Sequence, residues 1–497
     1  MEAAELAGII GAIGAAGALL AAERWLLLAG LALLAGAEAG LVLSISGDGG
    51  ISPALLALGA ASLIPAAIGA AIFTRWPEAV LPAVLAAAPF RPPLAFSGDN
   101  RYFVAVAEEG ELGRLLPLYG VLGAAALALA WQAFRGRQVH QLPAVVAYPA
   151  AAFIAIAAVS LTWTSQLDAG ANTLAYFILP FATLLAVAGR APFPPWMPRA
   201  LAIVAVSLAG LFAAVGLWQA ATHDLLFFSP SVEVGNAFSS FFRVTSLFRD
   251  PSLYGRHVVL GITVLLVALL RRRINVVVAA GLIAFLFAGL FFSYSQSSFA
   301  ALFVVTIALA LVAGDRRLRI AAIVTSAVVA LGGAGYLIAS SEDRSARQVT
   351  SDRSRRVEAT VEVIRDHPLV GVGLGAQPAE SQARSEQGGS PTRFVSHTTP
   401  LTVAAELGVL GLLSYLGFLA GAAVMIERVR RRDPTLGLAL GAVLLALVVH
   451  SLAYSGFFED PVTWVVVAVA CAAWVPYSAA ADDSEAPLAV PPQDAGA

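Results

Sequence analysis

The sequence predicts an all-α polytopic membrane protein with about 13–15 transmembrane helices and one large extracytoplasmic loop containing short amphipathic helices. The chain is 59% hydrophobic and 12% charged, with a mean hydropathy of +0.81, whereas a soluble domain is about half apolar and about a quarter charged. Apolar stretches of about 20 residues, the length that crosses a bilayer, recur along the chain. Clusters of arginine fall in alternate gaps between these stretches, which is typical of cytoplasmic loops.

Charge and cysteine content exclude several classes of function. The formal net charge of −2 is small and the 30 basic residues, all arginine, are scattered, so nothing favours a nucleic-acid partner. The lone Cys471 excludes a disulfide framework, a cysteine zinc site and an iron–sulfur cluster. The first apolar stretch, Leu6 to Ala22, has an acidic start and no basic segment before it, so we expect a retained helix rather than a cleaved signal peptide.

The candidate spans are separated by short polar breaks. The one near Val84 is short and bounded by prolines, so we expect it to be re-entrant. The candidates centre near Ala15, Gly36, Ile64, Val84, Ala126, Ile154, Leu179, Val206, Val264, Ile283, Val305, Val328, Leu416, Leu444 and Val467.

The arginine clusters set the expected sidedness. They occupy the gaps that we place in the cytoplasm: Arg135 and Arg137, Arg190 and Arg199, Arg271 to Arg273, Arg316 to Arg319, and Arg428 to Arg432. The other gaps then face outward: Ala221 to Arg256, Tyr294 to Ser298, the long loop from Ser340, and Tyr454 to Pro461. All four outward gaps contain polar or ionisable residues.

This pattern divides the chain into five parts. They are the N-terminal transmembrane helices (1–218), the central helices with an outward arginine-containing loop (219–339), the large extracytoplasmic loop (340–399), the C-terminal helices (400–480) and a disordered cytoplasmic tail (481–497).

Within the large loop, the pattern predicts an amphipathic helix ending at Asp366. Ser351–Asp352 offers an N-cap, and Val357, Val361 and Ile364 share one face with Arg353. A buried arginine needs an anion, so we expect Arg353 to contact a ligand, and Arg355 and Arg356 to face water or lipid headgroups. Gly371, Gly373 and Gly375 follow at alternate positions, which permits a tight turn or a close backbone approach to a ligand.

His397 precedes a helix that is expected to start near Pro400, at a membrane–water boundary. Because the unperturbed pKa of histidine is about 6.5, a neutral imidazole is accessible there as a general base. An ordinary interfacial polar residue fits the position as well. Glu406 follows inside an otherwise apolar helix, where a carboxyl group needs a partner or an aqueous cavity.

The string RSRRVEATVEVIRDHPLVGVGLG, Arg353 to Gly375, is followed by His397, Leu401, Glu406, Leu407 and Gly408. This pattern resembles the signature of the O-antigen ligase and O-antigen polymerase superfamily: an arginine, a DHP-L-x-G-x-G turn, and a histidine heading a helix with Leu, Glu and Gly. Two further segments are similar to the family, RVTSLFRDPS at Arg243 to Ser252 and the helix start at Ser293 to Leu302. The resemblance covers about Phe242 to Trp474.

The chain departs from the family pattern at four positions. Ser246 replaces a turn glycine, Ser252 and Thr398 replace asparagines, and Gln296 stands where many members have arginine. The last change removes a positive charge, so the donor's phosphates would depend more on Arg243, Arg249 and Arg353.

The resemblance implies a GT-C-like membrane glycosyltransferase of the bacterial cytoplasmic (inner) membrane, multi-pass, with an outward-facing active site. Such proteins move a glycan from an undecaprenyl-pyrophosphate carrier to a glycan or lipid acceptor. His397 and Arg353 would be catalytic, and Arg243, Arg249, Arg353, Glu406, Gly371 and Gly373 would bind substrate. Arginine supplies planar, permanently charged donors for a pyrophosphate leaving group. The sequence requires no metal or other cofactor. We read Asp250 as a turn residue, and Glu459–Asp460 as groups that orient an arginine or histidine at the same membrane face.

Three alternatives stay open. A polysaccharide polymerase of the O-antigen type would use another carrier-linked repeat as its acceptor. A transporter or flippase for lipid-linked sugars would use Arg353, Arg243 and Glu406 along its substrate path, but such groups should then line both halves near mid-membrane. A peptidoglycan-type glycosyltransferase should place a catalytic carboxylate in an outer loop, for which Asp250 or Asp352 is available without a matching motif.

Overall fold

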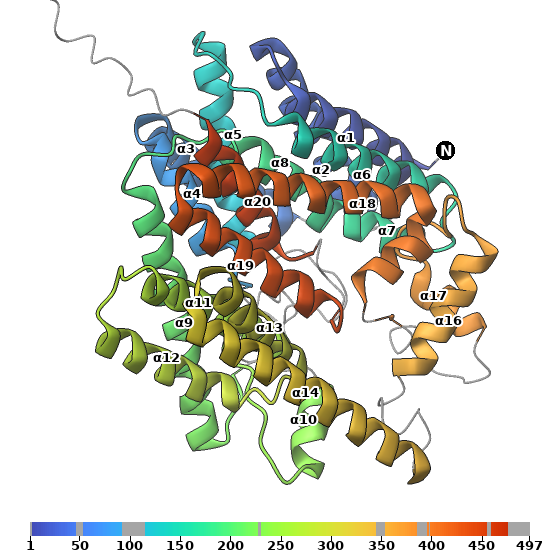
Figure 1. Cartoon of the computed structure of the whole chain (residues 1–497). Coiled ribbons are helices and arrows are strands. Elements are labelled where there is room, and N and C mark those ends of the chain that lie inside the picture. The colour runs from blue at the N-terminus through green and yellow to red at the C-terminus, as the bar shows by residue number, and fades with distance from the viewer. Residues whose placement is uncertain are drawn as a thin grey trace, which may run out of the picture.

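The structure is a computed structural model that describes residues 2–45, 53–91, 115–226, 230–343, 353–384, 395–396, 398–454 and 459–475. Within these ranges, only the backbone is described for residues 53–61, 230–231, 333–343 and 353–354. The described part is helical and contains no strand. The predicted all-α polytopic membrane fold is confirmed (Figure 1).

The described part of the N-terminal half consists of helices joined by short connections. They are α1 (Ala3–Leu20), α2 (Arg24–Ile45), α3 (Pro53–Arg75), η1 (Pro77–Ala79), α4 (Val80–Ala87), α5 (Leu116–Phe134), α6 (Ala144–Val159), η2 (Ser160–Thr162), α7 (Leu167–Thr173), the π-helical turn η3 (Leu174–Ile178), α8 (Leu179–Ala188) and α9 (Met197–Thr222).

The second half contains the remaining helices. They are α10 (Pro230–Phe238), α11 (Pro251–Leu270), α12 (Val276–Phe291), α13 (Gln296–Ala313), α14 (Arg316–Asp343), α16 (Arg353–Asp366), α17 (Gln377–Ala383), α18 (Thr399–Arg432), α19 (Pro434–Ser451) and α20 (Pro461–Trp474). Helix α18 packs against α6 of the first half, so the two halves form one bundle.

All predicted span centres lie in helices. Within the part of the chain that the structure describes, ten helices are long and apolar enough to cross a membrane, or eleven if one bent pair is a single span. Helices α12 and α20, at 16 and 14 residues, are apolar but short. An apolar stretch in the sequence does not reveal where the backbone bends or a helix ends, so these helix lengths come from the structure alone.

The segment around Val84 is bent, as its flanking prolines predict. Helix Ser62–Arg75 and the following helix Pro77–Ala87 meet at an angle of 115° around Trp76. Proline lacks a backbone N–H and disfavours helix in the residue before it, so Pro77 accounts for the break. The second arm enters the bundle and packs against α5, α9 and α20, as expected for a broken span or a re-entrant segment.

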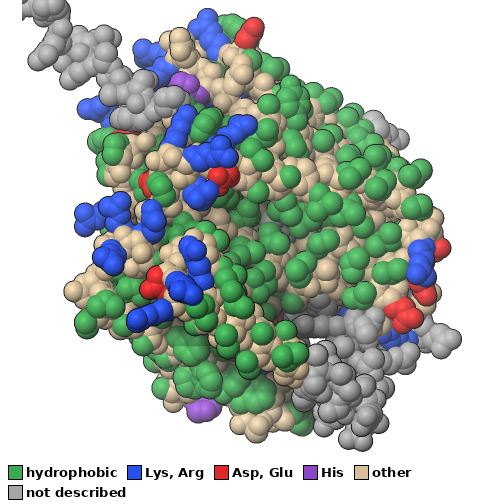
Figure 2. Space-filling model, in the orientation of Figure 1, with side chains coloured by type: hydrophobic (Ala, Val, Ile, Leu, Met, Phe, Trp, Pro, Cys, Tyr) green, Lys and Arg blue, Asp and Glu red, His purple; other side chains and the backbone are tan. Residues whose placement is uncertain are grey.

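The arginine clusters gather at one end of the bundle, which we call the arginine-rich end. Arg432 lies over the ring of Trp474 at the end of α20, 3.6 Å from the ring centroid. Arg271 donates to Thr435 Oγ1 at the start of α19, at 3.4 Å. Figure 2 shows most of the arginine side chains in view along the left of the molecule, beside a broad apolar surface. The clusters therefore share one end, as the charge pattern predicts.

Arg190 holds three segments together at this end. Its guanidinium donates to the carbonyl oxygens of His140, Ala186 and Ala18 at 2.8, 2.8 and 2.9 Å. Burial lowers the pKa of Arg190 to about 10, so the group stays charged at neutral pH. It therefore satisfies carbonyls at the ends of α1 and α8 that no helical N–H can reach.

We expect Arg190→Met to destabilise the protein by about 3 kcal/mol, because buried carbonyls lose charged donors. The free energy of unfolding should be measured by SDS titration of the purified protein in detergent. Arg199→Met is the matched control, since Arg199 is exposed at the same end. Equal stability of the two variants would contradict this role.

Candidate active site

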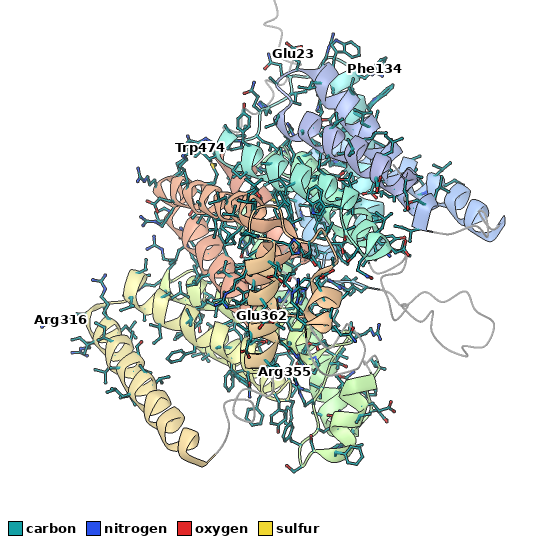
Figure 3. The ribbon with its side chains drawn as sticks, turned by 90° about the vertical axis from the view of Figure 1, so that its right-hand side faces the viewer. Glu23, Phe134, Arg316, Arg355, Glu362 and Trp474 are labelled. Carbon is teal, nitrogen blue, oxygen red and sulfur yellow. The ribbon has the colours of Figure 1, made fainter. Side chains whose placement is uncertain are left out.

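The predicted outward gaps meet at the opposite end of the bundle, which we call the loop end. Val244 N donates to Phe292 O at 3.1 Å, joining the segment before α11 to the turn between α12 and α13. Thr398 Oγ1 donates to Leu452 O at 3.2 Å, joining the start of α18 to the end of α19. Figure 3, viewed onto this end, shows α16 with Arg355 and Glu362 in front of the bundle. Segments far apart in sequence thus form one polar region.

A buried ion pair lies at the centre of this region. Arg256 Nη1 of α11 contacts Asp460 Oδ2 at the start of α20, and both residues are under 5% exposed. The same guanidinium donates through Nε to His450 Nδ1 at 3.3 Å and lies 5.5 Å from the ring centroid of Tyr454. A lone buried charge costs several kcal/mol, whereas a paired and hydrogen-bonded one is compensated. Helices α11, α19 and α20 therefore meet at an ion pair that has no net charge.

The ring of His450 is held in one tautomer. Because Arg256 Nε can only donate, His450 Nδ1 must accept and the proton must be on Nε2. Nε2 lies 3.1 Å from Ser297 Oγ and 3.2 Å from Ser252 O, both of which can accept its hydrogen bond. A doubly protonated ring would place an N–H against the arginine N–H. His450 is therefore a neutral residue that positions Arg256, and it links α11, α13 and α19.

Asp460 is the orienting group that the sequence predicts at this membrane face. Burial opposes ionisation of Asp460, but the guanidinium of Arg256 outweighs it and holds the pKa of the carboxyl below its usual value. The carboxylate also accepts from Val462 N at 2.8 Å. Its neighbour Glu459 is exposed, whereas Asp460 is buried and forms the ion pair with Arg256.

Backbone hydrogen bonds join the glycine-rich turn, Gly371 to Gly375, to α18. Val372 N donates to Ala405 O at 2.9 Å, and Gly373 N donates to Glu406 O at 2.8 Å. These acceptors are free because Gly408, with φ +63°, breaks the regular helix at this point. The kink thus exposes carbonyls that the turn satisfies.

Two glycines allow the turn and the kink to approach each other. A Cβ atom on Gly371 would lie 2.3 Å from the Glu406 carbonyl carbon, and one on Gly408 would lie 2.3 Å from the Leu369 carbonyl carbon. Both residues have positive φ, which only glycine adopts readily. Gly373 packs in the same way against Thr164. The close approach of these glycines is to protein backbone, and a contact of Gly371 or Gly373 with substrate stays a prediction.

Glu406 lies beneath the glycine-rich turn and is 9% exposed. Its carboxyl group faces the backbone amides of Gly375 and Gln377 and interacts electrostatically with Glu459. The partner that an ionisable group in an apolar helix needs is therefore supplied by the turn. Substrate binding by Glu406 remains a prediction.

Helix α16 forms as predicted, but its buried face differs from the predicted one. Ala359, Thr360 and Val363 are buried, whereas Val361 is only half-buried. Thr360 Oγ1 accepts from Gln377 Nε2 of α17 at 3.1 Å, so contact with α17 and α18 sets the face. Arg355 and Arg356 are half-buried and interact with other residues, and their facing water or lipid headgroups stays a prediction. The side chain of Arg353 lies outside the described atoms, so its predicted role is untested.

Arg243 and Arg249 lie in the segment before α11. Arg243 Nε donates to Ser293 O at 3.4 Å, beside the start of α13. Arg249 is half-buried and interacts with other residues. Asp250 accepts from Ser252 N at 2.6 Å as the N-cap of α11, which confirms it as a turn residue. The structure thus brings Arg243 and Arg249 to the same end as Arg256, His450 and Asp460, which we call the Arg256 cluster.

Ser246 stands where the family pattern has glycine, and its φ of +55° gives the reason for a glycine there. The buried side chain of Gln219 holds this strained turn: its Oε1 accepts from Ser246 N at 2.6 Å and its Nε2 donates to Ser246 O at 2.9 Å. Ser246 Oγ adds a hydrogen bond to Phe212 O at 2.7 Å. Serine is therefore accommodated without loss of the turn.

His397 lies outside the described residues, but its neighbours are anchored at the loop end. Ser396 N donates to Gln377 Oε1 at 3.3 Å, and Thr398 is bonded to the end of α19 as noted above. Among the described residues, no group of three or more His, Cys, Asp or Glu side chains could hold a metal ion. Metal-independent chemistry and the role of His397 both remain predictions.

The sequence reasoning missed Arg256, His257 and His450. Each is an ionisable residue inside an otherwise apolar span. That criterion singled out Glu406, because such a group needs a partner or an aqueous cavity. Applied to every span, it would have found all three.

The fold and the site define the class: a multi-pass α-helical membrane protein whose arginine, histidine and carboxyl groups converge at one end of its bundle. Residues 279–416 match the family model Wzy_C, described as O-antigen ligase. This match confirms the resemblance to the O-antigen ligase family and supports membrane glycan transfer of that type. No curated protein matches the chain.

We expect Asp460→Asn to destabilise the protein by about 3–5 kcal/mol, because it leaves Arg256 buried without a counter-charge. The adjacent exposed Glu459→Gln is the matched control. The depressed pKa of Asp460 stabilises the fold above the unfolded-state pKa, about 3.9, and that stabilisation is lost as the pH falls through the folded-state value. The difference in the free energy of unfolding between wild type and Asp460→Asn, measured by SDS titration, should therefore shrink in acid. A gap that widens in acid would disprove the assignment.

Proposed function

We propose that this protein is a glycosyltransferase that moves a glycan from an undecaprenyl-pyrophosphate carrier to an acceptor on the outer face of the bacterial cytoplasmic membrane. The observation that carries the proposal is the convergence of Arg243, Arg249 and the Arg256 cluster with the start of α18 at the loop end. Opposite it lie the arginine clusters typical of a cytoplasmic face.

The concentration of polar groups at one end favours transfer chemistry over transport. A transporter should carry its ionisable groups near the bilayer midplane and in both halves. Here the ion pair Arg256–Asp460 and the hydrogen-bonded His450 lie at the ends of their helices, in the second half. This is the arrangement that a surface reaction on a lipid-anchored donor needs.

The proposed reaction is a substitution at the anomeric carbon. The acceptor hydroxyl oxygen bonds to that carbon as the bond from the carbon to the pyrophosphate oxygen breaks. His397 takes the hydroxyl proton, and undecaprenyl pyrophosphate leaves with the bonding electrons. Arg353, Arg243 and Arg249 stabilise the charge that develops on the leaving group.

The decisive experiment is transfer in vitro with purified protein, a carrier-linked glycan and candidate acceptors. A glycan released from the carrier onto a different acceptor identifies a ligase, whereas a longer glycan that stays on the carrier identifies a polymerase. Movement of the intact donor across a proteoliposome membrane, with no new glycosidic bond, would refute the proposal in favour of a transporter.

We expect His397→Ala to lower the transfer rate at least about a hundredfold, the usual contribution of a general base. Binding of the carrier lipid should change little, because the base acts on the acceptor hydroxyl. His367→Ala is the control, since His367 is exposed in the same loop. Retained turnover in His397→Ala would remove it as the base.

We expect Arg353→Lys to lower the transfer rate about tenfold or more, because lysine keeps the charge but loses the two-pronged donor geometry. Arg365→Lys, an exposed position on the same helix, is the control. Wild-type rates in Arg353→Lys would show that planar geometry at this position is irrelevant.

A further inference from the structure

Arg91 is a cation that the proposed mechanism does not use, and it lies inside the bundle. The helix Pro77–Ala87 starts at the arginine-rich end, where Pro77 lines a pocket with Arg137. Its 11 residues advance about 16 Å at 1.5 Å per residue, away from that end. Arg91 follows the end of this helix and is half-buried.

Aromatic contacts connect Phe90, the residue before Arg91, to His257, the residue after Arg256. The ring of Phe90 packs edge-on against Phe212 of α9, with centroids 6.0 Å apart. Phe212 in turn contacts the ring of His257 at 5.8 Å. Arg91 also interacts electrostatically with His257 and Tyr454. A residue from the first half of the chain thus joins the loop-end site.

Among the residues that the structure describes, Arg91 makes no hydrogen bond or ion pair. Nearby, Arg256 and Asp460 neutralise each other and His450 is neutral. A cation at membrane depth requires an anionic partner or water. The positive charge of Arg91 is therefore available to an anionic ligand.

His257 presents an acceptor beside this charge. Its Nδ1 lies 2.9 Å from Leu253 O and must carry the proton, since a carbonyl only accepts. In the neutral ring, Nε2 then has a lone pair, and this atom is buried without a hydrogen-bond partner. Stacking on Phe248, at 4.7 Å and 22°, keeps the ring in place. A buried acceptor without a partner lacks the hydrogen bond that water would give it, and a ligand hydroxyl would replace that bond.

We propose that Arg91 and His257 form a binding subsite for the sugar phosphate of the lipid-linked donor, with the phosphate on Arg91 and a sugar hydroxyl donating to His257 Nε2. The inference rests on the proposed function and adds to it a residue of the N-terminal half. The ligand class follows from the two groups together: a guanidinium selects an anion, and a fixed acceptor selects an adjacent hydroxyl. The phosphate on the first sugar of a lipid-linked glycan places an anion next to sugar hydroxyl groups.

Binding to the full-length protein in detergent tests each half separately. The probes are undecaprenyl pyrophosphate and the same lipid carrying one N-acetylglucosamine, with dissociation constants measured by native mass spectrometry. We expect Arg91→Gln to weaken binding of both probes about tenfold, the effect of one lost charged hydrogen bond. Arg75→Gln is the matched control, because Arg75 precedes the bend and lies over Trp76 at 5.9 Å.

We expect His257→Asn to weaken the binding of the sugar-bearing probe alone. Its affinity should fall to that of undecaprenyl pyrophosphate without the sugar. Asparagine can keep the donor to Leu253 O but has no acceptor at the Nε2 position, whereas His257→Gln restores an acceptor there and should recover part of the affinity. Unchanged binding of the sugar-bearing probe by His257→Asn would show that Nε2 serves a water molecule only, and would overturn this half of the subsite.

The remaining outcomes separate the subsite from the proposed function. If wild type binds both probes and Arg91→Gln binds them equally well, the subsite is wrong and the proposed function stands. If wild type binds the two probes with the same affinity, the sugar contact is wrong. If wild type binds neither probe, the proposed function fails, and the subsite fails with it.

Discussion

The arrangement of the loop end depends on one requirement, that the charge of Arg256 be neutralised inside an apolar bundle. Asp460 meets this requirement from α20, and His450 adds a neutral acceptor from α19. Because His450 must then carry its proton on Nε2, it reaches Ser297 of α13 and the carbonyl of Ser252. A single buried charge thereby determines how four helices meet, and it explains why the turns before α11, α13 and α20 share one polar region.

A second constraint divides the site into a scaffold and a reactive part. The kink at Gly408 exposes carbonyls on α18, and the glycine-rich turn satisfies them through its own backbone. The turn in turn supplies amides to the carboxyl group of Glu406. These glycines therefore allow the turn and the kink of α18 to pack closely against each other. The predicted catalytic histidine follows a segment that this scaffold anchors through Ser396.

The family match covers residues 279–416, yet the polar region extends well beyond them. Arg256, His450 and Asp460 lie on either side of the matched segment, and Arg91 comes from a bent helix in the first half. The N-terminal helices therefore contribute more than a membrane anchor. Through Phe90 and Phe212, the bent helix packs against α9 and reaches the ring of His257. A family motif alone would leave this contribution unseen.

The sequence by itself determined the helical membrane fold, the common end of the arginine clusters and the orienting role of Asp460, because apolar length, loop charge and turn chemistry are local properties. It placed a helix at every predicted span and a cap at Asp250. Only the tertiary structure decided which helices are too short or too bent to count as spans, and which face of α16 is buried. It alone paired Arg256 with His450 and Asp460, since residues 194 and 204 positions apart meet only through helix packing.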